Sequence, residues 1–190
     1  LTIHSWTGIG ITRHATDSEI KAIASNRRVA KRCEKTDVLI IDEISMLDAD
    51  RLSLVDRVLK AARGSVAAFG GMQVIFCGDF FQLPPVAREG EPPPQFAYHS
   101  TAWKELNPKI CYLTEQFRQG NDTLLKILNA VRQAEVNDEI REHLRERRDA
   151  PQGTQRVTKL YSHNEDVDAE NTRELARISG EATRYHMESS

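Results

Sequence analysis

The hydrophobic pattern of the chain has its clearest features in two short apolar runs, residues 38–41 and 74–77. Both runs are continuous and rich in β-branched residues, which is typical of strands buried on both faces of a parallel sheet. Polar residues follow directly, with Asp42 and Glu43 after the first run and Asp79 after the second. Because α/β proteins bind ligands at the carboxyl ends of their parallel strands, we expect these side chains to share one rim of the sheet.

Hydrophobic residues at helical spacing predict several flanking helices. These helices are expected to begin near Asp17 or Ser18, Asp48 or Asp50, Asp122, Asn137 or Asp138, and Asn164. The second of them is expected to end at Gly64, and a short packed helix is expected within 96–106. Further strands are expected at 1–11, before a glycine turn, and at 110–114 and 157–161. The order of elements predicts an α/β fold in which residues 1–150 form part of one domain and residues 151–190 begin a second.

Composition excludes several classes of protein. The chain has 190 residues and a net charge of −2, so it lacks the overall basic character of many nucleic-acid-binding proteins. Its three cysteines form no CxxC pair or Cys/His cluster, which argues against a zinc site or disulfide framework and favours a reducing, intracellular compartment. That compartment would be the cytoplasm in a bacterium, and the nucleus or mitochondrion in a eukaryote. No apolar stretch approaches membrane-spanning length, so we expect no contact with a membrane.

One local departure from this charge balance is a basic run at 27–35. A solvated helix face is the commoner explanation of such a run, and a contact with a phosphate backbone is the alternative.

The polar residues at the strand ends suit phosphate chemistry. Carboxylates such as Asp42 and Glu43 can hold Mg²⁺ and orient an attacking water beside a phosphate. Gln82 can donate to a phosphate oxygen and accept from water, and Arg118 is suited to stabilise charge on a transferred phosphoryl group. Simpler interpretations exist for these residues: a solvated turn for the two acids, and an ion pair with Glu115 for Arg118.

Two loops carry residues suited to contact a nucleic acid. The first is a glycine-bearing turn preceded by polar side chains: His4, Ser5, Thr7 and Gly8. Such a turn lets a ligand backbone approach closely, although an ordinary loop explains these residues equally well. The second loop follows the second apolar run and contains Pro84 and Pro85 next to two phenylalanines, rings that can stack on bases. The alternative is that both phenylalanines belong to the core, which we expect for one of them.

Four segments in this order, TIHSWTGIG, DVLIIDEISM, GDFFQLPPV and LTEQFRQ, resemble the motifs of PIF-type superfamily 1 DNA helicases, which are relatives of RecD. The resemblance covers nearly the whole chain, and GDFFQLPPV after DEISM is its most specific part. It implies an incomplete RecA-like P-loop NTPase core and 5′-to-3′ unwinding of DNA driven by ATP with Mg²⁺. It also implies single-stranded and forked DNA as partners, a monomer, and roles in DNA repair, recombination and telomere maintenance.

The resemblance further implies a role for each site residue. Asp42 would hold Mg²⁺ through water, and Glu43 would activate the hydrolytic water. Gln82 would sense the γ-phosphate and couple it to DNA, and Arg118 would contact that phosphate. Single-stranded DNA would be contacted at His4, Ser5, Thr7, Gly8, Pro84 and Pro85, while residues 12–36 would take the place of a small wedge subdomain.

The family's phosphate-binding loop, GxxxxGK[ST], does not occur in the chain, which contains no Gly-Lys pair. Without the lysine and backbone amides of that loop, the β- and γ-phosphates lose most of their binding site. We therefore expect a fragment of a longer helicase, also without the family's later motifs, that is inactive alone. One alternative is a fragment that binds single-stranded nucleic acid without catalysis. Another, in which Gln82 and Arg118 have no role, is a metal nuclease built on Asp42, Glu43, Asp48 and Asp79.

Overall fold

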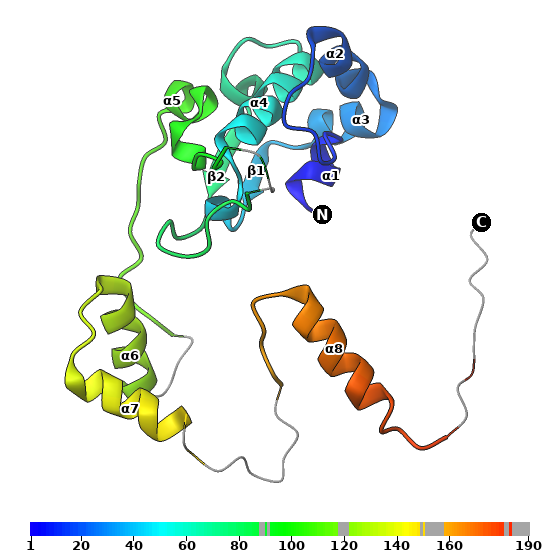
Figure 1. The fold of residues 1–190 in the computed structure, drawn as a ribbon. Helices are drawn as coiled ribbons and strands as arrows, with labels where there is room; N and C mark the ends of the chain where they lie inside the picture. Colours follow the sequence, from blue (N-terminus) through cyan, green and yellow to red (C-terminus); the bar gives the residue numbers. More distant parts are fainter. Residues whose placement is uncertain are drawn as a thin grey trace. The chain divides into compact units, whose positions relative to one another are not determined.

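The computed structural model, drawn as a ribbon in Figure 1, describes residues 1–87, 90, 92–117, 122–148, 150, 158–180 and 183. The chain divides into two compact units. The first unit comprises residues 1–133 and the second residues 134–190. The predicted domain boundary lies at residue 150, so the first compact unit ends earlier than the domain expected from the sequence. The assignment of the two units to successive RecA-like domains stays a prediction.

A two-stranded parallel sheet lies in the first unit. Strand β1 (Val38–Ile41) pairs with strand β2 (Gln73–Phe76), and Val38 lies opposite Gln73 while Ile41 lies opposite Phe76. The parallel pairing predicted from the two apolar runs is confirmed, although β2 begins and ends one residue before the predicted run.

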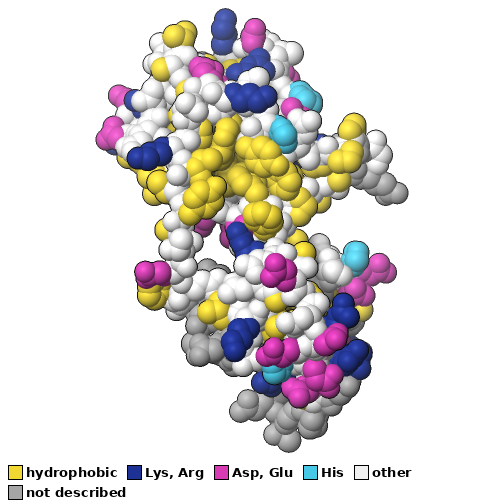
Figure 2. Space-filling view, turned by 90° about the vertical axis from the view of Figure 1, so that its left-hand side faces the viewer, with side chains coloured by type: hydrophobic (Ala, Val, Ile, Leu, Met, Phe, Trp, Pro, Cys, Tyr) yellow, Lys and Arg dark blue, Asp and Glu magenta, His cyan; other side chains and the backbone are white. Residues whose placement is uncertain are grey.

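Only one face of this sheet is covered by the described residues. Leu39 and Ile41 are buried, whereas Val38 and Ile40 are 41% and 62% exposed. Ile75, the partner of Ile40 in the register, is also exposed, which places these hydrophobic residues on one open face. The prediction that both faces are buried is therefore wrong for the described residues, because they leave this face open to solvent. Hydrophobic side chains gather widely at the surface shown in Figure 2.

Helix α4 (Ala49–Arg63) shares its core with the buried side of the sheet. The side chain of Asp48 accepts the N–H of Arg51 at 2.8 Å and caps the helix, and Gly64 ends it in the left-handed conformation. Of the two predicted caps, Asp48 and Asp50, the structure has Asp48, and the predicted end at Gly64 is confirmed. Its fully buried hydrophobic residues are Leu52, Leu54, Val55, Val58 and Leu59.

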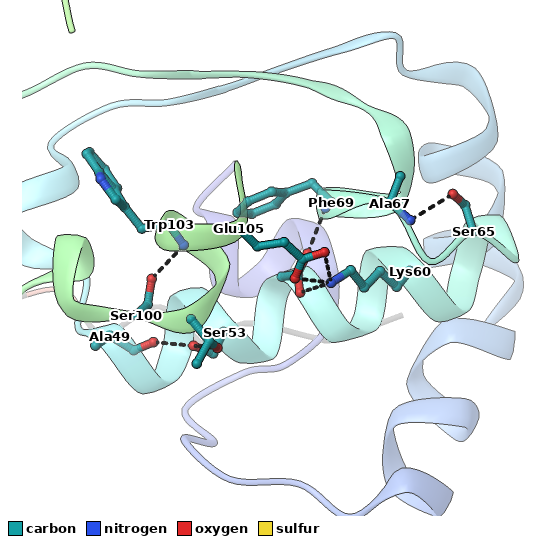
Figure 3. Close-up of polar contacts among 11 residues, drawn as sticks. Ala49, Ser53, Lys60, Ser65, Ala67, Phe69, Ser100, Trp103 and Glu105 are labelled. Atoms are coloured by element: carbon teal, nitrogen blue, oxygen red, sulfur yellow. Dashed lines mark hydrogen bonds and ion pairs between the residues drawn. The ribbon is translucent and has the colours of Figure 1, made fainter. Parts of the chain in front are cut away.

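Polar contacts fix α4 to two later segments. Lys60 donates to Glu105 of α5 (Thr101–Leu106) at 2.7 Å (Figure 3). The same ammonium lies 2.9 Å from the carboxylate of Asp56. Asp56 in turn accepts the N–H of Phe69 at 2.7 Å, in the 3₁₀ turn η2 (Ala68–Gly71) just before β2. The buried hydrogen bond from Phe69 to Asp56 fixes the approach of the chain to its second strand.

The region expected to form one helix from Asp17 contains two. A capping box at Thr16 starts α2 (Asp17–Ser25), and Asn26 then interrupts the helix and caps α3 (Arg27–Lys35) through its side-chain oxygen. The apolar residues of both helices face the core shared with α4. Arg63 of α4 donates to the last carbonyls of this region, those of Cys33 and Thr36, at 2.8 and 3.0 Å.

The strand expected at 1–11 is wrong, because this segment forms the short helix α1 (Ile3–Thr7). Thr2 caps α1 by accepting the N–H of Ser5, and Gly8 ends it with φ of 78°. The remaining elements of the first unit are η1 (Ile44–Met46), η3 (Ala97–His99) and α6 (Asp122–Gln133). The strand expected at 110–114 is not formed: these residues are irregular in the structure.

The second unit contains α7 (Asp138–Arg148) and α8 (Asn164–Leu175), both of which the sequence predicts. The strand expected at 157–161 is not seen in its described residues, 158–161, which are irregular, and Val157 lies outside the described part of the chain. No helix among the described residues is long and apolar enough to cross a membrane.

Candidate functional site

Backbone contacts hold the carboxyl ends of β1 and β2 together beyond the sheet itself. Cys77 N–H donates to the carbonyl of Ile41 at 2.9 Å, and Ile44 N–H donates to the carbonyl of Cys77 at 3.0 Å. A side chain at Gly78 would not fit, because its Cβ would lie 2.9 Å from the backbone nitrogen of Ile44. These contacts set the segment after β1 beside the segment after β2.

The segments that follow β1 and β2 are here called the strand-end junction. Asp42 and Glu43 lie in this junction, and both are exposed. Glu43 has φ of 51°, a left-handed conformation that costs a residue other than glycine about 1–2 kcal/mol. Its N–H donates to Oδ1 of Asp42 at 2.9 Å, which orders the turn. The turn therefore presents two adjacent carboxylates at the carboxyl ends of the strands, where oxygen ligands for Mg²⁺ are expected.

Gln82 follows a turn that is organised by Asp79. The carboxylate of Asp79 accepts the N–H of Phe81 at 3.0 Å and the side-chain amide of Gln82 at 3.3 Å, while its carbonyl accepts the N–H of Gln82 at 3.0 Å. Gln82 itself is exposed, so its amide stands at the surface of the junction.

Arg132 of α6 reaches this turn from far along the sequence. Its guanidinium pairs with the carboxylate of Asp79 and lies 4.9 Å from the ring centre of Phe81. The hydrogen bond from Arg132, followed by those from Phe81 and Gln82, holds the pKa of Asp79 below its usual value despite partial burial. Asp79 thus orders the turn through these contacts. The sequence does not indicate this role, because no local motif links Asp79 to Arg132.

The four carboxylates of the nuclease alternative do not act as a group. Asp79 is paired with Arg132, and Asp48 is buried in an ion cluster of its own, which leaves Asp42 and Glu43. In the part of the chain that the structure describes, no three His, Cys, Asp or Glu side chains gather as a metal site. The structure therefore gives the nuclease alternative no support.

Arg118 lies outside the described residues, so its place at the strand ends stays a prediction.

The residues predicted to contact DNA divide into exposed and buried positions. Thr7 is fully buried, and its hydroxyl donates to the carbonyl of Ile3 at 2.7 Å, so that hydroxyl is already engaged within α1. Pro85 is also buried, whereas Ser5, Gly8 and Pro84 are exposed. His4 is half-buried; burial, together with the charge of Arg51, lowers its pKa and favours the neutral imidazole.

A buried carboxylate joins these loops to the segment after β1. Asp48 is 2% exposed and lies 3.5 Å from Nε of Arg13 and 2.5 Å from Nη1 of Arg51. Arg13 also donates to the carbonyl of Val86, and Arg51 to that of Ile11, at 3.4 and 3.3 Å. The cluster thereby connects the N-terminal loop, the loop after Pro85 and the start of α4, although the sequence predicts Asp48 only as a helix cap.

A parallel sheet whose strands end in adjacent carboxylates and in a glutamine-bearing turn has the organisation of a RecA-like α/β motor domain, here incomplete. The sequence profile of PIF1-like helicases matches residues 1–142. The chain belongs to this PIF1-like helicase family, which confirms the resemblance of its motifs.

Named relatives and solved structures agree with this membership. The chain is 43% identical to the ATP-dependent DNA helicase Pif1 of Psychrobacter, covering 98% of the chain and 29% of that protein. It is 36% identical to human ATP-dependent DNA helicase PIF1, over 97% of the chain and again 29% of the relative.

Pif1 helicase from Candida albicans superimposes with a TM-score of 0.84 at 36% identity, over 95% of the chain and 41% of that structure. Bacteroides Pif1 in complex with ADP-AlF3 and ssDNA superimposes with a TM-score of 0.76 at 28% identity, over 95% of the chain and 44% of that structure. The RecA-like fold predicted from the sequence is confirmed, and the chain spans less than half the length of these relatives.

Proposed function

We propose that this chain is part of an ATP-dependent 5′-to-3′ DNA helicase that couples ATP hydrolysis to movement along single-stranded DNA. One observation carries the proposal. The pairing of Cys77 with Ile41 and Ile44 sets the acids after β1 beside the turn that bears Gln82. An exposed carboxylate pair and an exposed amide at adjacent strand ends are the groups that ATP hydrolysis requires from this part of a motor domain.

In this proposal each group has one task. Asp42 would hold Mg²⁺ through water, and a bound ion there would supply positive charge beside the phosphates. Glu43 accepts a proton from the hydrolytic water, for which its exposed carboxylate is suited. Gln82 donates its amide to the γ-phosphate, and Arg118 adds a guanidinium to the same phosphate.

The DNA-binding part of the proposal rests on the two loops joined by Asp48. Ser5, Gly8 and Pro84 are their exposed predicted contact residues, and the loops share one buried anchor. Related Pif1 structures contain single-stranded DNA, and one describes two coordinating helicases at forked double-stranded DNA. We therefore propose single-stranded and forked DNA as partners and an intracellular location. The predicted monomer, and roles in repair, recombination and telomere maintenance, stay predictions.

Substitution of Glu43 by glutamine tests the catalytic assignment in the longer helicase that includes a phosphate-binding loop. We expect DNA-stimulated ATP hydrolysis to fall by about 10²–10⁴-fold, the contribution of a general base. The control is Asp50→Asn, which removes a carboxylate that is 63% exposed at the start of α4. Normal hydrolysis by the Glu43→Gln helicase would refute the assignment, as would an equal loss in the control.

The chain alone is expected to hydrolyse no ATP, because its sequence contains no GxxxxGK[ST] loop. Its two DNA-contact loops are both present, which favours a second candidate function: binding of single-stranded nucleic acid without catalysis. Fluorescence anisotropy of labelled single-stranded DNA tests whether the chain alone binds a single strand. Absence of binding at low salt would exclude this second function.

A further inference from the structure

Helix α3 carries a concentration of positive charge that the proposed site does not use. Its nine residues, RRVAKRCEK, contain five cations and one acid, in a chain whose net charge is −2. Val29 and Cys33 are buried in the core, so the helix has a defined outer side. The residues that line an open hollow on that side, together with Ser5 and Thr36, are Arg28, Lys31, Arg32 and Lys35, here called the α3 basic face.

The cations of α3 differ from those of α4 in their partners. Three of the four cations of α4, Arg51, Arg57 and Lys60, each lie within 3 Å of a carboxylate, and the fourth, Arg63, donates to backbone carbonyls. Among the described residues, no carboxylate lies within ion-pair distance of any cation of α3. Arg32 instead donates to two backbone carbonyls, those of Arg28 and Ser5, at 3.1 and 3.2 Å. The charge of the α3 basic face is therefore uncompensated and available to an anionic partner.

We propose that the α3 basic face binds the sugar–phosphate backbone of duplex DNA. The inference rests on the proposed helicase function and names the form of DNA that this face contacts. Positions 28, 31, 32 and 35 follow the spacing of one helix face, and this stripe of cations spans about 10 Å at 1.5 Å per residue. Such a stripe can neutralise several phosphates at once, because duplex DNA carries about one charge per 1.7 Å of its axis.

The composition of α3 favours a duplex over a single strand. Proteins that bind single strands use aromatic platforms on which bases stack, and α3 contains no aromatic residue. A duplex offers phosphates without exposed base faces, which matches a surface made of lysine and arginine side chains. The bond from Arg32 to the carbonyl of Ser5 sets the α3 basic face against the first predicted DNA-contact loop. A duplex bound here would thus lie beside the path proposed for the single strand.

The test compares two charge-neutralised variants of this chain. The first is Arg28→Gln/Lys31→Gln/Lys35→Gln, which keeps Arg32 and its backbone contacts and introduces residues that favour helices. The control, Arg141→Gln/Arg145→Gln/Arg147→Gln, removes the same charge from α7, where Arg141 and Arg145 are paired with acids of their own helix. Circular dichroism verifies that each variant is folded.

Fluorescence anisotropy then measures binding of a labelled blunt duplex and of a single strand of equal length, from about 50 to 200 mM salt. For the duplex, the slope of log K against log salt is expected to decrease by about 0.9 for each phosphate that the variant no longer neutralises. If the affinity extrapolated to 1 M salt is unchanged, this slope means that the affinity in 0.1 M salt falls about eightfold for each such phosphate. The single variant Lys31→Gln should show one such step, and the α7 control none.

Three results would overturn the inference. The first is no duplex binding by the unmodified chain, and the second is an unchanged duplex affinity and salt slope in the α3 variant. The third is a loss of affinity for the single strand that equals or exceeds the loss for the duplex, which would show that the face does not prefer a duplex. The ATPase test with Glu43→Gln does not depend on any of these results. Failure of this inference and failure of the proposed function are therefore distinguishable.

Discussion

Replacement of Asp48 by asparagine tests whether the buried ion cluster holds the two segments predicted to contact DNA to the start of α4. Asparagine caps a helix as well as aspartate does, so the hydrogen bond to Arg51 N–H can be kept. The substitution removes only the negative charge that Arg13 and Arg51 share. Arg13 and Arg51 would then each lose, in a largely buried site, the charged carboxylate that they contact.

The expected loss of stability follows from this burial. Removal of one partner of a buried ion pair costs about 3–5 kcal/mol. The side chains of Arg13 and Arg51 are 14% and 15% exposed, so they keep some hydration and we take the lower end, about 3 kcal/mol. With a urea dependence of about 2 kcal/mol per M, the unfolding midpoint should fall by about 1.5 M.

Urea unfolding followed by circular dichroism measures this shift, with Asp17→Asn as a matched control. Asp17 pairs with Arg57 at 2.8 Å, but its side chain is 90% exposed, and such pairs contribute about 0–1 kcal/mol. The control should move the midpoint by less than about 0.5 M. A shift for Asp48→Asn no larger than that of the control would refute the view that this cluster anchors the loops.

Two further substitutions test the junction at the strand ends. Arg132→Ala should raise the pKa of Asp79 and cost less than about 1 kcal/mol at neutral pH, because the pair is partly exposed. Since the folded-state pKa of Asp79 is lowered, this stabilisation is present above its unfolded pKa and is lost as pH falls through the folded value. Urea unfolding at neutral and acidic pH should therefore show a difference from the unmodified chain that shrinks in acid, and a constant difference would contradict this. Gly78→Ala should destabilise the chain by more than about 2 kcal/mol, because it combines a positive φ with contact against Ile44, whereas Gly10→Ala, with positive φ but open space, should cost less in the same assay.

The elements that the sequence predicts correctly are those with strong local signals. The continuous apolar run 38–41 forms a strand, and α4 begins and ends at the residues that its cap and glycine indicate. At the N-terminus, alternation of apolar and polar residues predicts a strand, but the cap at Thr2 and the bond from Thr7 to Ile3 stabilise a helical turn there. Local capping outweighs periodicity in so short a segment.

The parts that could not be predicted depend on contacts between distant residues. The pair of Arg132 with Asp79 joins positions 53 residues apart, and the cluster at Asp48 takes Arg13 from another segment. Motif spacing points to Thr7 and Pro85 as contact residues, but it carries no information on their burial, which depends on packing of the whole unit.

The two-strand sheet has a consequence for how this chain joins other polypeptide. Each of β1 and β2 has a neighbour on one side, so the backbone donors and acceptors along its other side have no sheet partner among the described residues. Added strands could extend the ladder in both directions, and covering segments could bury Val38, Ile40 and Ile75 at the same time. The sheet can therefore be extended by further strands that pair with the outer edges of β1 and β2. Such strands would hold the carboxylates of Asp42 and Glu43, at the end of β1, more rigidly.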